Sequence, residues 1–357
     1  HLRGCENVTV QDVTVYAASG FAFFEGERSP GGNTYRRCRL VRKPGTDRLL
    51  AGAADAFHSL MQQRGPLVED CEFSWAADDL MNIHGFLQLV WQVRSPTELV
   101  VAGPFARNFR EGTVLRFYRE PNATFLGEAK VLQWQPAEGV TPETVAEELP
   151  ALFREKYGLR MRSFPDAEPC LVTLDRPVEV NRADFVASQD WCGRGAVVRN
   201  CHFHDGHVRG VLIKSPESRV ENNRIERLAR SGIVVKPEIF WLEGPFAEGI
   251  KIVGNTVSDC GWLAYTDEGM YSEFAPIQVL SAFSTRLFPP LWTHAAPIRG
   301  IEIRDNRIER APGPGLFIAN AAHVTITGNA IHAPPGDGAA PGAHSLPCHL
   351  AAGRGHD

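Results

Sequence analysis

The fold is decided by a short stretch that recurs along the chain, clearest in Val198-Arg199-Asn200-Cys201-His202-Phe203 and again in Val220-Glu221-Asn222-Asn223-Arg224-Ile225. Cys201 and Asn223, the central residues of these two copies, are 22 residues apart. Further copies of the template are centred on Cys38, Cys71, Asn255, Asn306 and Asn329. Short β-rich runs at this period predict a solenoid in which equal positions of successive coils stack. We therefore expect an all-β chain that forms a right-handed parallel β-helix.

The repeat also assigns side chains to the two faces of the stacked strands. Two apolar positions of each coil are expected to line the core, and they are held by Met81, Val211, Ile233 and Leu316, and by Ile83, Ile213, Val235 and Ile318. Since side chains alternate along a strand, the next position faces outward, and in successive coils it carries His84, Lys214 and Lys236. The turn entering this strand carries Asp79 and then Arg209, which brings a carboxylate beside a guanidinium.

The chain has eight cysteines, three of which fall on one coil position. Cys38, Cys71 and Cys201 stand where other coils carry Asn, so we expect a stacked row of small buried thiols. A metal site or a redox pair is the less favoured interpretation, because no CxxC motif or Cys/His spacing typical of structural zinc is present.

The composition is that of an ordinary globular chain, with 43% hydrophobic and 22% charged residues among 357. The formal charge of −5 does not favour nucleic acid or an anionic membrane as a partner, and no apolar run approaches the length of a spanning helix. The sequence starts without Met, inside a strand-like run from Glu6 to Val15. We expect a piece of a longer bacterial protein, secreted or periplasmic, with any export signal upstream.

The repeat disappears between Phe86 and about Phe185. Alternating apolar runs separated by Gly and Pro predict a small antiparallel β-barrel there, with one helix that starts at Thr141-Pro142-Glu143 and ends near Tyr157. The expected units are solenoid coils at 1–85 and 186–333, the barrel at 86–185, and a disordered Pro/Gly/Ala-rich tail at 334–357.

Carboxylates and histidines recur immediately before the insertion, which makes this the candidate reactive centre. Asp55 lies 24 residues before Asp79, Asp78 precedes Asp79 directly, and His58 and His84 accompany them. Glycoside hydrolysis usually needs two carboxyl groups, one protonated and one ionised, and crowding raises the pKa of one of them. For the sugar we expect contacts from His58, Asn82, His84, Arg209, Lys214 and Lys236, together with Trp241 and Glu243 on a downstream loop.

Other interpretations stay open at this stage. Asp is common in solenoid turns as a backbone cap, Lys214 and Lys236 could form a solvated edge, and Trp241 could simply pack its loop. Acid clusters can also bind Ca²⁺, although the basic neighbours argue against a cage for that ion. The same fold would suit a polysaccharide lyase with Lys214 or Arg209 as its base, or a carbohydrate-binding solenoid without activity.

Five segments share a recognisable pattern: Asp55-Ala56-Phe57-His58, residues 64–73, Asp78-Asp79-Leu80-Met81-Asn82-Ile83-His84-Gly85, residues 209–214 and residues 241–245. They resemble the active-site coils of the α-1,3-galactosidases of glycoside hydrolase family 110. The resemblance covers most of residues 1–332 and implies a β-helix with an inserted barrel. It also implies inverting, metal-independent removal of terminal α-1,3-linked galactose, as in the blood-group B determinant, with no cofactor. By resemblance, Asp78 is the general acid, and Asp55 and Asp79 position the attacking water.

Overall fold

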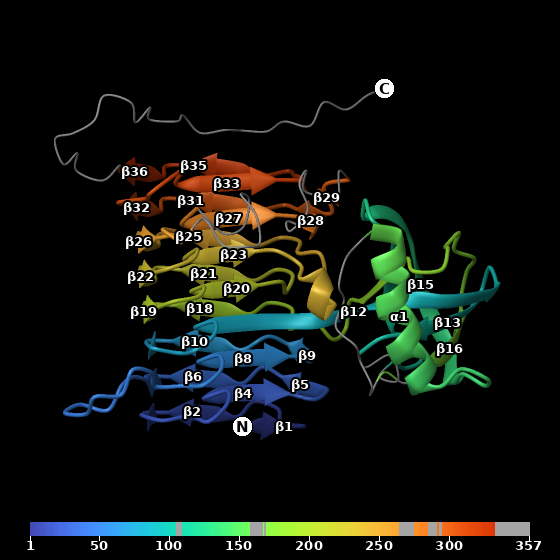
Figure 1. Cartoon of the computed structure of the whole chain (residues 1–357), viewed down its shortest axis with the longest axis horizontal. Coiled ribbons are helices and arrows are strands. Elements are labelled where there is room, and N and C mark those ends of the chain that lie inside the picture. The colour runs from blue at the N-terminus through green and yellow to red at the C-terminus, as the bar shows by residue number, and fades with distance from the viewer. Residues whose placement is uncertain are drawn as a thin grey trace.

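The computed structural model describes residues 1–104, 109–157, 167, 169–263, 275–284, 291–292 and 295–332. Most of these residues stack into a parallel β-helix, with a second body of antiparallel strands beside it (Figure 1). The predicted tail at 334–357 lies outside the described residues. No described helix is long and apolar enough to cross a membrane.

Three parallel sheets run the length of the solenoid. The first contains β2 (Thr9–Gln11), β6 (Thr34–Arg36), β10 (Leu67–Glu69), β18 (Val197–Arg199), β21 (Arg219–Glu221), β25 (Lys251–Val253), β31 (Glu302–Arg304) and β35 (Thr325–Thr327). The second contains β3 (Thr14–Val15), β7 (Arg39–Leu40), β11 (Glu72–Ser74), β19 (His202–Gly206), β22 (Arg224–Leu228), β26 (Thr256–Cys260), β32 (Arg307–Glu309) and β36 (Ala330–His332). These are the repeated template strands, so the predicted coil is confirmed.

The third sheet carries the candidate site. It contains β1 (Leu2–Arg3), β4 (Phe23–Gly26), β8 (Phe57–Leu60), β12 (Met81–Ser95), β20 (Val211–Ile213), β23 (Ile233–Val235), β27 (Ile277–Leu280) and β33 (Leu316–Ala319). Between Ile233 and Leu316 this ladder contains a further rung, β27, which agrees with the 51-residue interval from Asn255 to Asn306.

Short paired strands complete the solenoid. They are β5 (Ser29–Gly31) with β9 (Gln62–Arg64), β28 (Ala282–Ser284) with β29 (Leu291–Trp292), β30 (Ile298–Arg299) with β34 (Ala321–Ala322), and β24 (Glu243–Gly244) against β12. The last pairing matters for the site, because it folds a downstream loop back onto the strand that follows the aspartates.

The cysteine and asparagine positions form one hydrogen-bonded row through the solenoid. The backbone N–H of Cys38 donates to Cys71 Sγ, Cys71 N–H to Cys201 Sγ, and Cys201 N–H to Asn223 Oδ1 at 2.9 Å. The row continues through Asn255, Asn306 and Asn329. All three cysteines are free thiols. The predicted stacked row is therefore confirmed, and Cys and Asn can take the same place there because sulfur and amide oxygen both accept a hydrogen bond from the backbone N–H.

The inserted body is a closed barrel of six antiparallel strands. In order around the barrel they are β12, β13 (Glu98–Ala102), β16 (Cys170–Leu174), β15 (Thr124–Pro136), β14 (Val114–Arg119) and β17 (Phe185–Ser188). Helix α1 (Pro142–Tyr157) starts where Thr141 Oγ1 accepts the Thr144 N–H, as predicted.

Strand β12 belongs to both bodies and carries the solenoid into the barrel (Figure 1). Its first residues pair with β8 and β20 of the solenoid, and Leu87–Leu89 pair with β17 of the barrel. At the change of direction, a Cβ on Gly85 would lie 2.4 Å from the Trp191 carbonyl oxygen, so a larger residue does not fit. The strand that follows the aspartates is therefore held from both sides.

A buried carboxyl group in the first coils makes stability depend on pH. Glu25 in β4 is fully buried and accepts hydrogen bonds from Asn33, Tyr35 and Ser59. Burial raises its pKa above the ordinary 4.5. Its contribution to stability is therefore complete below pH 4.5 and is lost as the pH rises through the raised value, at about 1.4 kcal/mol per unit of pKa difference.

We expect Glu25→Gln to remove this loss. The melting temperatures of the variant and the parent should be similar near pH 4.5, and the variant should melt higher at mildly alkaline pH. Thermal denaturation across this pH range measures the difference in melting temperature between variant and parent. The other titrating groups are the same in both proteins, so their effects cancel in this difference. A gap between the two proteins that stays constant with pH would contradict the interpretation.

Candidate functional site

The three aspartates meet at the start of the strands that flank the insertion. Because β8, β12 and β20 pair in parallel register, Asp55, Asp79 and Arg209, each two residues before its strand, form one row. Asp78 stands one residue earlier than Asp79 and accepts the Asp79 N–H at 3.1 Å. One carboxylate oxygen of each aspartate lies within 4.8 Å of the other two. The predicted cluster of acids therefore exists in space.

The three acids differ in their surroundings. Asp78 is exposed at its edge of the cluster, whereas Asp55 and Asp79 are 4% and 2% exposed. Partial burial of its carboxyl group and the nearby Asp55 raise the pKa of Asp78. Burial also raises the pKa of Asp79 well above its usual value, and the charge of Arg209 opposes this shift. Crowding thus favours a proton in the cluster.

Arg209 joins the aspartates to a loop from a later coil. Its Nε and Nη2 donate to the two oxygens of Asp79 at 2.7 and 2.8 Å, and its Nη1 donates to Glu238 Oε1 at 2.7 Å. Such a bidentate pair fixes the plane of a carboxylate as well as its charge. Arg209 is 8% exposed, so it acts mainly on Asp79 and Glu238.

Lys214 is fully buried beneath the same loop. Its Nζ donates to Glu243 at 2.6 Å, to Asn82 at 3.0 Å and to Glu238 at 3.2 Å. Although burial opposes ionisation, the two glutamates raise the pKa of Lys214. Burial likewise opposes ionisation of Glu238, but Arg209 and Lys214 hold its pKa well below the ordinary value. Lys214 therefore points out of the coil, toward the loop that carries Glu238 and Glu243, and this loop covers it.

Two histidines connect this ion-pair network back to Asp55. His84 Nδ1 lies 2.8 Å from the Gly85 carbonyl oxygen, His84 Nε2 lies 3.1 Å from His58 Nε2, and His58 Nδ1 lies 2.7 Å from Asp55 Oδ2. Phe21 stacks on the His58 ring with centroids 4.3 Å apart. The two rings therefore connect the Gly85 carbonyl group to Asp55 through hydrogen-bonding contacts.

The hydrogen-bond partners determine the tautomers of the two histidines. A carbonyl oxygen can only accept, so His84 carries its proton on Nδ1, and burial lowers the pKa of His84 to about 3, which keeps it neutral. Its Nε2 must then accept from His58 Nε2–H. The other nitrogen of His58, Nδ1, is then the one that contacts Asp55.

We expect ¹⁵N spectra of the imidazole rings to show His84 as a neutral Nδ1–H tautomer throughout pH 5 to 8, because its pKa is lowered to about 3. His84→Gln assigns the signal. The exposed His323 provides an internal comparison. A His84 signal that titrates near the ordinary value of 6.5 would contradict the assignment.

The remaining predicted contacts lie on or near the loop that leaves β23. Lys236 is partly exposed and its charge contributes to the low pKa of Glu238. Trp241 ends a 3₁₀ turn (Ile239–Trp241), is 41% exposed and packs edge-on against Phe240. Glu243 lies in β24 against β12 and is 3.6 Å from His84. The structure thus brings the predicted polar residues to one site, with Asp78 exposed and Lys214 and His84 buried, while the Trp241 side chain contacts Phe240 on the loop beside it.

Glu238, one of two glutamates on the loop after β23, was not among the predicted sugar contacts, although it bridges Arg209 and Lys214. The charges could have indicated it. Arg209 and Lys214 are both predicted to face outward, and two buried cations need more carboxylate partners than Asp79 alone. Phe21 was also missed, because stacking on His58 brings together two coils whose sequences share no template.

The aspartate cluster has the donor type of a Ca²⁺ site but not the charge balance of one. Both oxygens of Asp79 already accept hydrogen bonds from Arg209. A hard cation would have to displace this guanidinium, and Ca²⁺ usually takes six or more oxygen ligands. The described donors therefore fit proton chemistry better than a resident metal.

Comparison with known proteins relates the chain to a β-helix family model and to named galactosidases. A family model described as a right-handed β-helix region matches residues 184–279. Alpha-1,3-galactosidase A of Bacteroides fragilis is 24% identical over 305 residues, which are 84% of this chain and 44% of the relative. Alpha-1,3-galactosidase B of Bacteroides thetaiotaomicron is 23% identical over 226 residues, covering 62% of this chain and 33% of the relative.

Among solved structures, the mannuronan C-5 epimerase AlgE6 A-module of Azotobacter vinelandii has a TM-score of 0.38 and 11% identity over 92% of this chain and 59% of that chain. The tailspike protein gp49 of Pseudomonas phage LKA1 has a TM-score of 0.33 and 9% identity, covering 78% and 47%. The chain spans less than half of the length of the curated relatives. The chain thus has a parallel β-helix fold, matches a β-helix family model in part, and is similar in sequence to proteins named α-1,3-galactosidase.

Proposed function

We propose that this chain holds the catalytic centre of an exo-acting glycoside hydrolase that removes terminal α-1,3-linked galactose with inversion of configuration. The observation that carries the proposal is the convergence of Asp55, Asp78 and Asp79 to within 4.8 Å. The relationship to named α-1,3-galactosidases supports a glycosidase role and a carbohydrate substrate.

Asp78 is the proposed general acid. It is the exposed member of the cluster, and its pKa is raised, so it can reach a glycosidic oxygen and still hold a proton to donate. Five carboxyl groups, those of Asp55, Asp78, Asp79, Glu238 and Glu243, surround the two buried cations. Arg209 binds Asp79 and Glu238, and Lys214 binds Glu238 and Glu243, so neither of these two cations is left for Asp78, which favours a proton there.

Asp55 and Asp79 are the proposed partners of the attacking water. A water that donates to both needs oxygens at most about 5.6 Å apart, twice a normal hydrogen-bond distance, and the observed limit of 4.8 Å fits. Arg209 occupies both oxygens of Asp79 and so opposes its use as a nucleophile. Asp55 can accept the proton of the water, since His58 holds its other side.

The distance between the two catalytic carboxyl groups of a glycosidase is related to whether it inverts or retains the configuration of the anomeric carbon. Carboxyl groups of inverting enzymes are usually about 6.5–9.5 Å apart and those of retaining enzymes about 5–5.5 Å. The oxygens here are within 4.8 Å. Inversion is proposed from the arginine clamp on Asp79 and from the family resemblance.

The lyase alternative is less well supported by the site. It needs Lys214 or Arg209 as an accessible base, but Lys214 is 0% exposed and bound to two glutamates, and Arg209 is 8% exposed and held by Asp79 and Glu238. Neither group can meet the α-proton of a uronate without breaking these ion pairs.

Proton NMR of the purified chain with Galα1-3Gal and, in parallel, with the fucosylated B trisaccharide tests the proposal. Early appearance of the β-anomer of galactose is expected. The α-anomer would replace inversion by retention, an unsaturated product would favour a lyase, and binding without any new signal would indicate a carbohydrate-binding solenoid. Comparison of the two sugars tells whether a branching fucose is accepted.

A further inference from the structure

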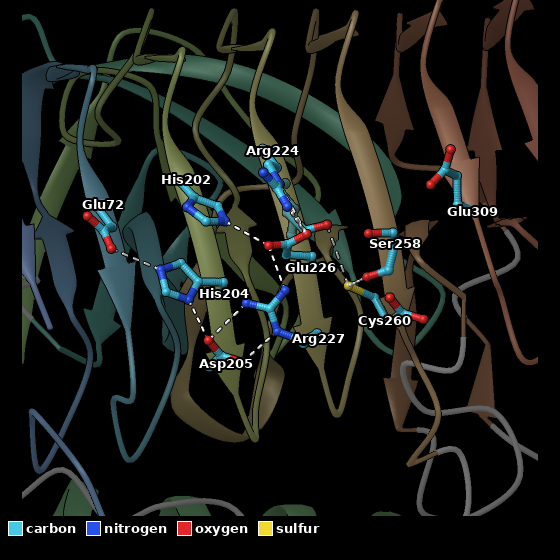
Figure 2. A network of polar contacts seen from close by, with 12 residues as sticks. Glu72, His202, His204, Asp205, Arg224, Glu226, Arg227, Ser258, Cys260 and Glu309 are labelled. Carbon is cyan, nitrogen blue, oxygen red and sulfur yellow. Dashed lines mark hydrogen bonds and ion pairs between the residues drawn. The ribbon is translucent and has the colours of Figure 1, made fainter. Parts of the chain in front are cut away.

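A second cluster of polar side chains lies on another sheet of the solenoid, formed by β11, β19 and β22. His202 and His204 are two residues apart in β19, so both point outward on the same face while Phe203 between them is fully buried. Glu72 in β11 is the register partner of His202. Figure 2 shows these side chains converging with those of β22.

Each histidine has one nitrogen anchored to a carboxylate. His204 Nδ1 lies 2.6 Å from Asp205 Oδ2, and His202 Nε2 lies 3.1 Å from Glu226 Oε1 (Figure 2). Arg227 donates to both carboxylates of these pairs. Carboxylates clamped by a guanidinium are ionised acceptors, so each of these ring nitrogens carries a proton and donates it.

This anchoring leaves His204 Nε2 and His202 Nδ1 as the lone-pair nitrogens of the neutral rings. His204 Nε2 lies 3.2 Å from Glu72 Oε1, while Arg39 binds the other oxygen of Glu72. In the neutral state this contact sets an acceptor against an acceptor. It needs a cation between the two atoms, which is either a second proton on His204 or a metal ion.

We propose that His202, His204 and Glu72 form a transition-metal site of the Zn²⁺ type. One donor atom from each of the three residues lies within 4.8 Å of the other two. Two imidazoles and a carboxylate are ligands that Zn²⁺ prefers, with water as a fourth. The Asp205–His204 and Glu226–His202 pairs are the carboxylate–histidine partners that orient metal-binding imidazoles.

The two imidazole rings stack on one another, nearly parallel at 27° with centroids 4.1 Å apart. Binding of one ion by both rings therefore requires them to turn about χ2. The charges of Glu72, Asp205 and Glu226 are matched by Arg39, Arg224 and Arg227. The local balance is neutral before binding, so we expect reversible uptake rather than a permanently filled site.

Isothermal titration of the metal-stripped full chain with Zn²⁺ tests the proposal without any assay of activity. We expect one bound ion, a rise in melting temperature, and visible absorption on substitution with Co²⁺. His202→Gln, His204→Gln and Glu72→Gln should each weaken binding about 10-fold or more, and Asp205→Asn should weaken it to a similar degree by releasing His204.

Two controls locate the ion. His323→Gln removes an exposed histidine of a distant turn, and Asp78→Asn alters the other acid cluster, so both should bind Zn²⁺ as the parent does. Binding that persists in His204→Gln, or that is lost in Asp78→Asn, would overturn the proposal. Absence of Zn²⁺ binding by the parent would also overturn it and would assign the cation to a proton shared by His204 and Glu72.

Discussion

Replacing Asp78 by Asn is expected to lower kcat on Galα1-3Gal by about 10²–10⁴-fold, because a positioned general acid contributes that much to proton transfer. Asn keeps the shape of the side chain and can still accept the Asp79 N–H, so the fold should be unaffected. The galactose released over time, followed by NMR, gives the rate.

Asp70→Asn is the matched control for this variant. Asp70 is exposed in the same coil, with a positive φ of 57°, and Asn occupies the equivalent turn at Asn200 and Asn222. Its rate should equal that of the parent. An aryl α-galactoside with a good leaving group needs little proton donation, so Asp78→Asn should lose much less activity on it. An equal loss on both substrates would contradict the role of acid.

The same assignment predicts the direction of the pH profile. Asp78 must be protonated to act, and partial burial and Asp55 raise its pKa. Activity of the parent should therefore fall as the pH rises through this raised value. On the aryl substrate, Asp78→Asn should lack this alkaline limb.

Replacing Lys214 by Met is expected to destabilise the chain by about 3–5 kcal/mol, because removal of one partner leaves buried carboxylates without their counter-ion. Lys214 is fully buried, and its Nζ binds Glu238 and Glu243. Met has a similar volume, so lost packing contributes little. Chemical denaturation measures the change.

Lys251→Met is the matched control, since Lys251 is 55% exposed and its Nζ lies 3.7 Å from Glu302. A surface pair of this kind contributes about 0–1 kcal/mol. Adding Glu243→Gln to Lys214→Met should recover part of the loss, because it removes one of the uncompensated charges. A Lys214→Met variant as stable as the parent, or no recovery in the double variant, would show that the buried network does not depend on this charge.

Part of the site followed from the repeat alone. Parallel strands in register stack equal positions, so a 24-residue step from Asp55 to Asp79 was enough to place these acids in one row with Arg209. The burial of Lys214 and His84 could not be obtained in this way. Alternation along a strand tells that a side chain leaves the coil, but not whether another segment covers it.

The sequence by itself determined the solenoid, the row of cysteines and asparagines, the barrel and helix α1, because each is encoded by a local period or cap that repeats or ends at fixed positions. Only the tertiary structure decided how Glu238 closes the network between Arg209 and Lys214, and how two histidines link it to Asp55. These contacts join the aspartate coils to an aperiodic loop. Its path depends on packing against β12 rather than on any pattern of its own residues.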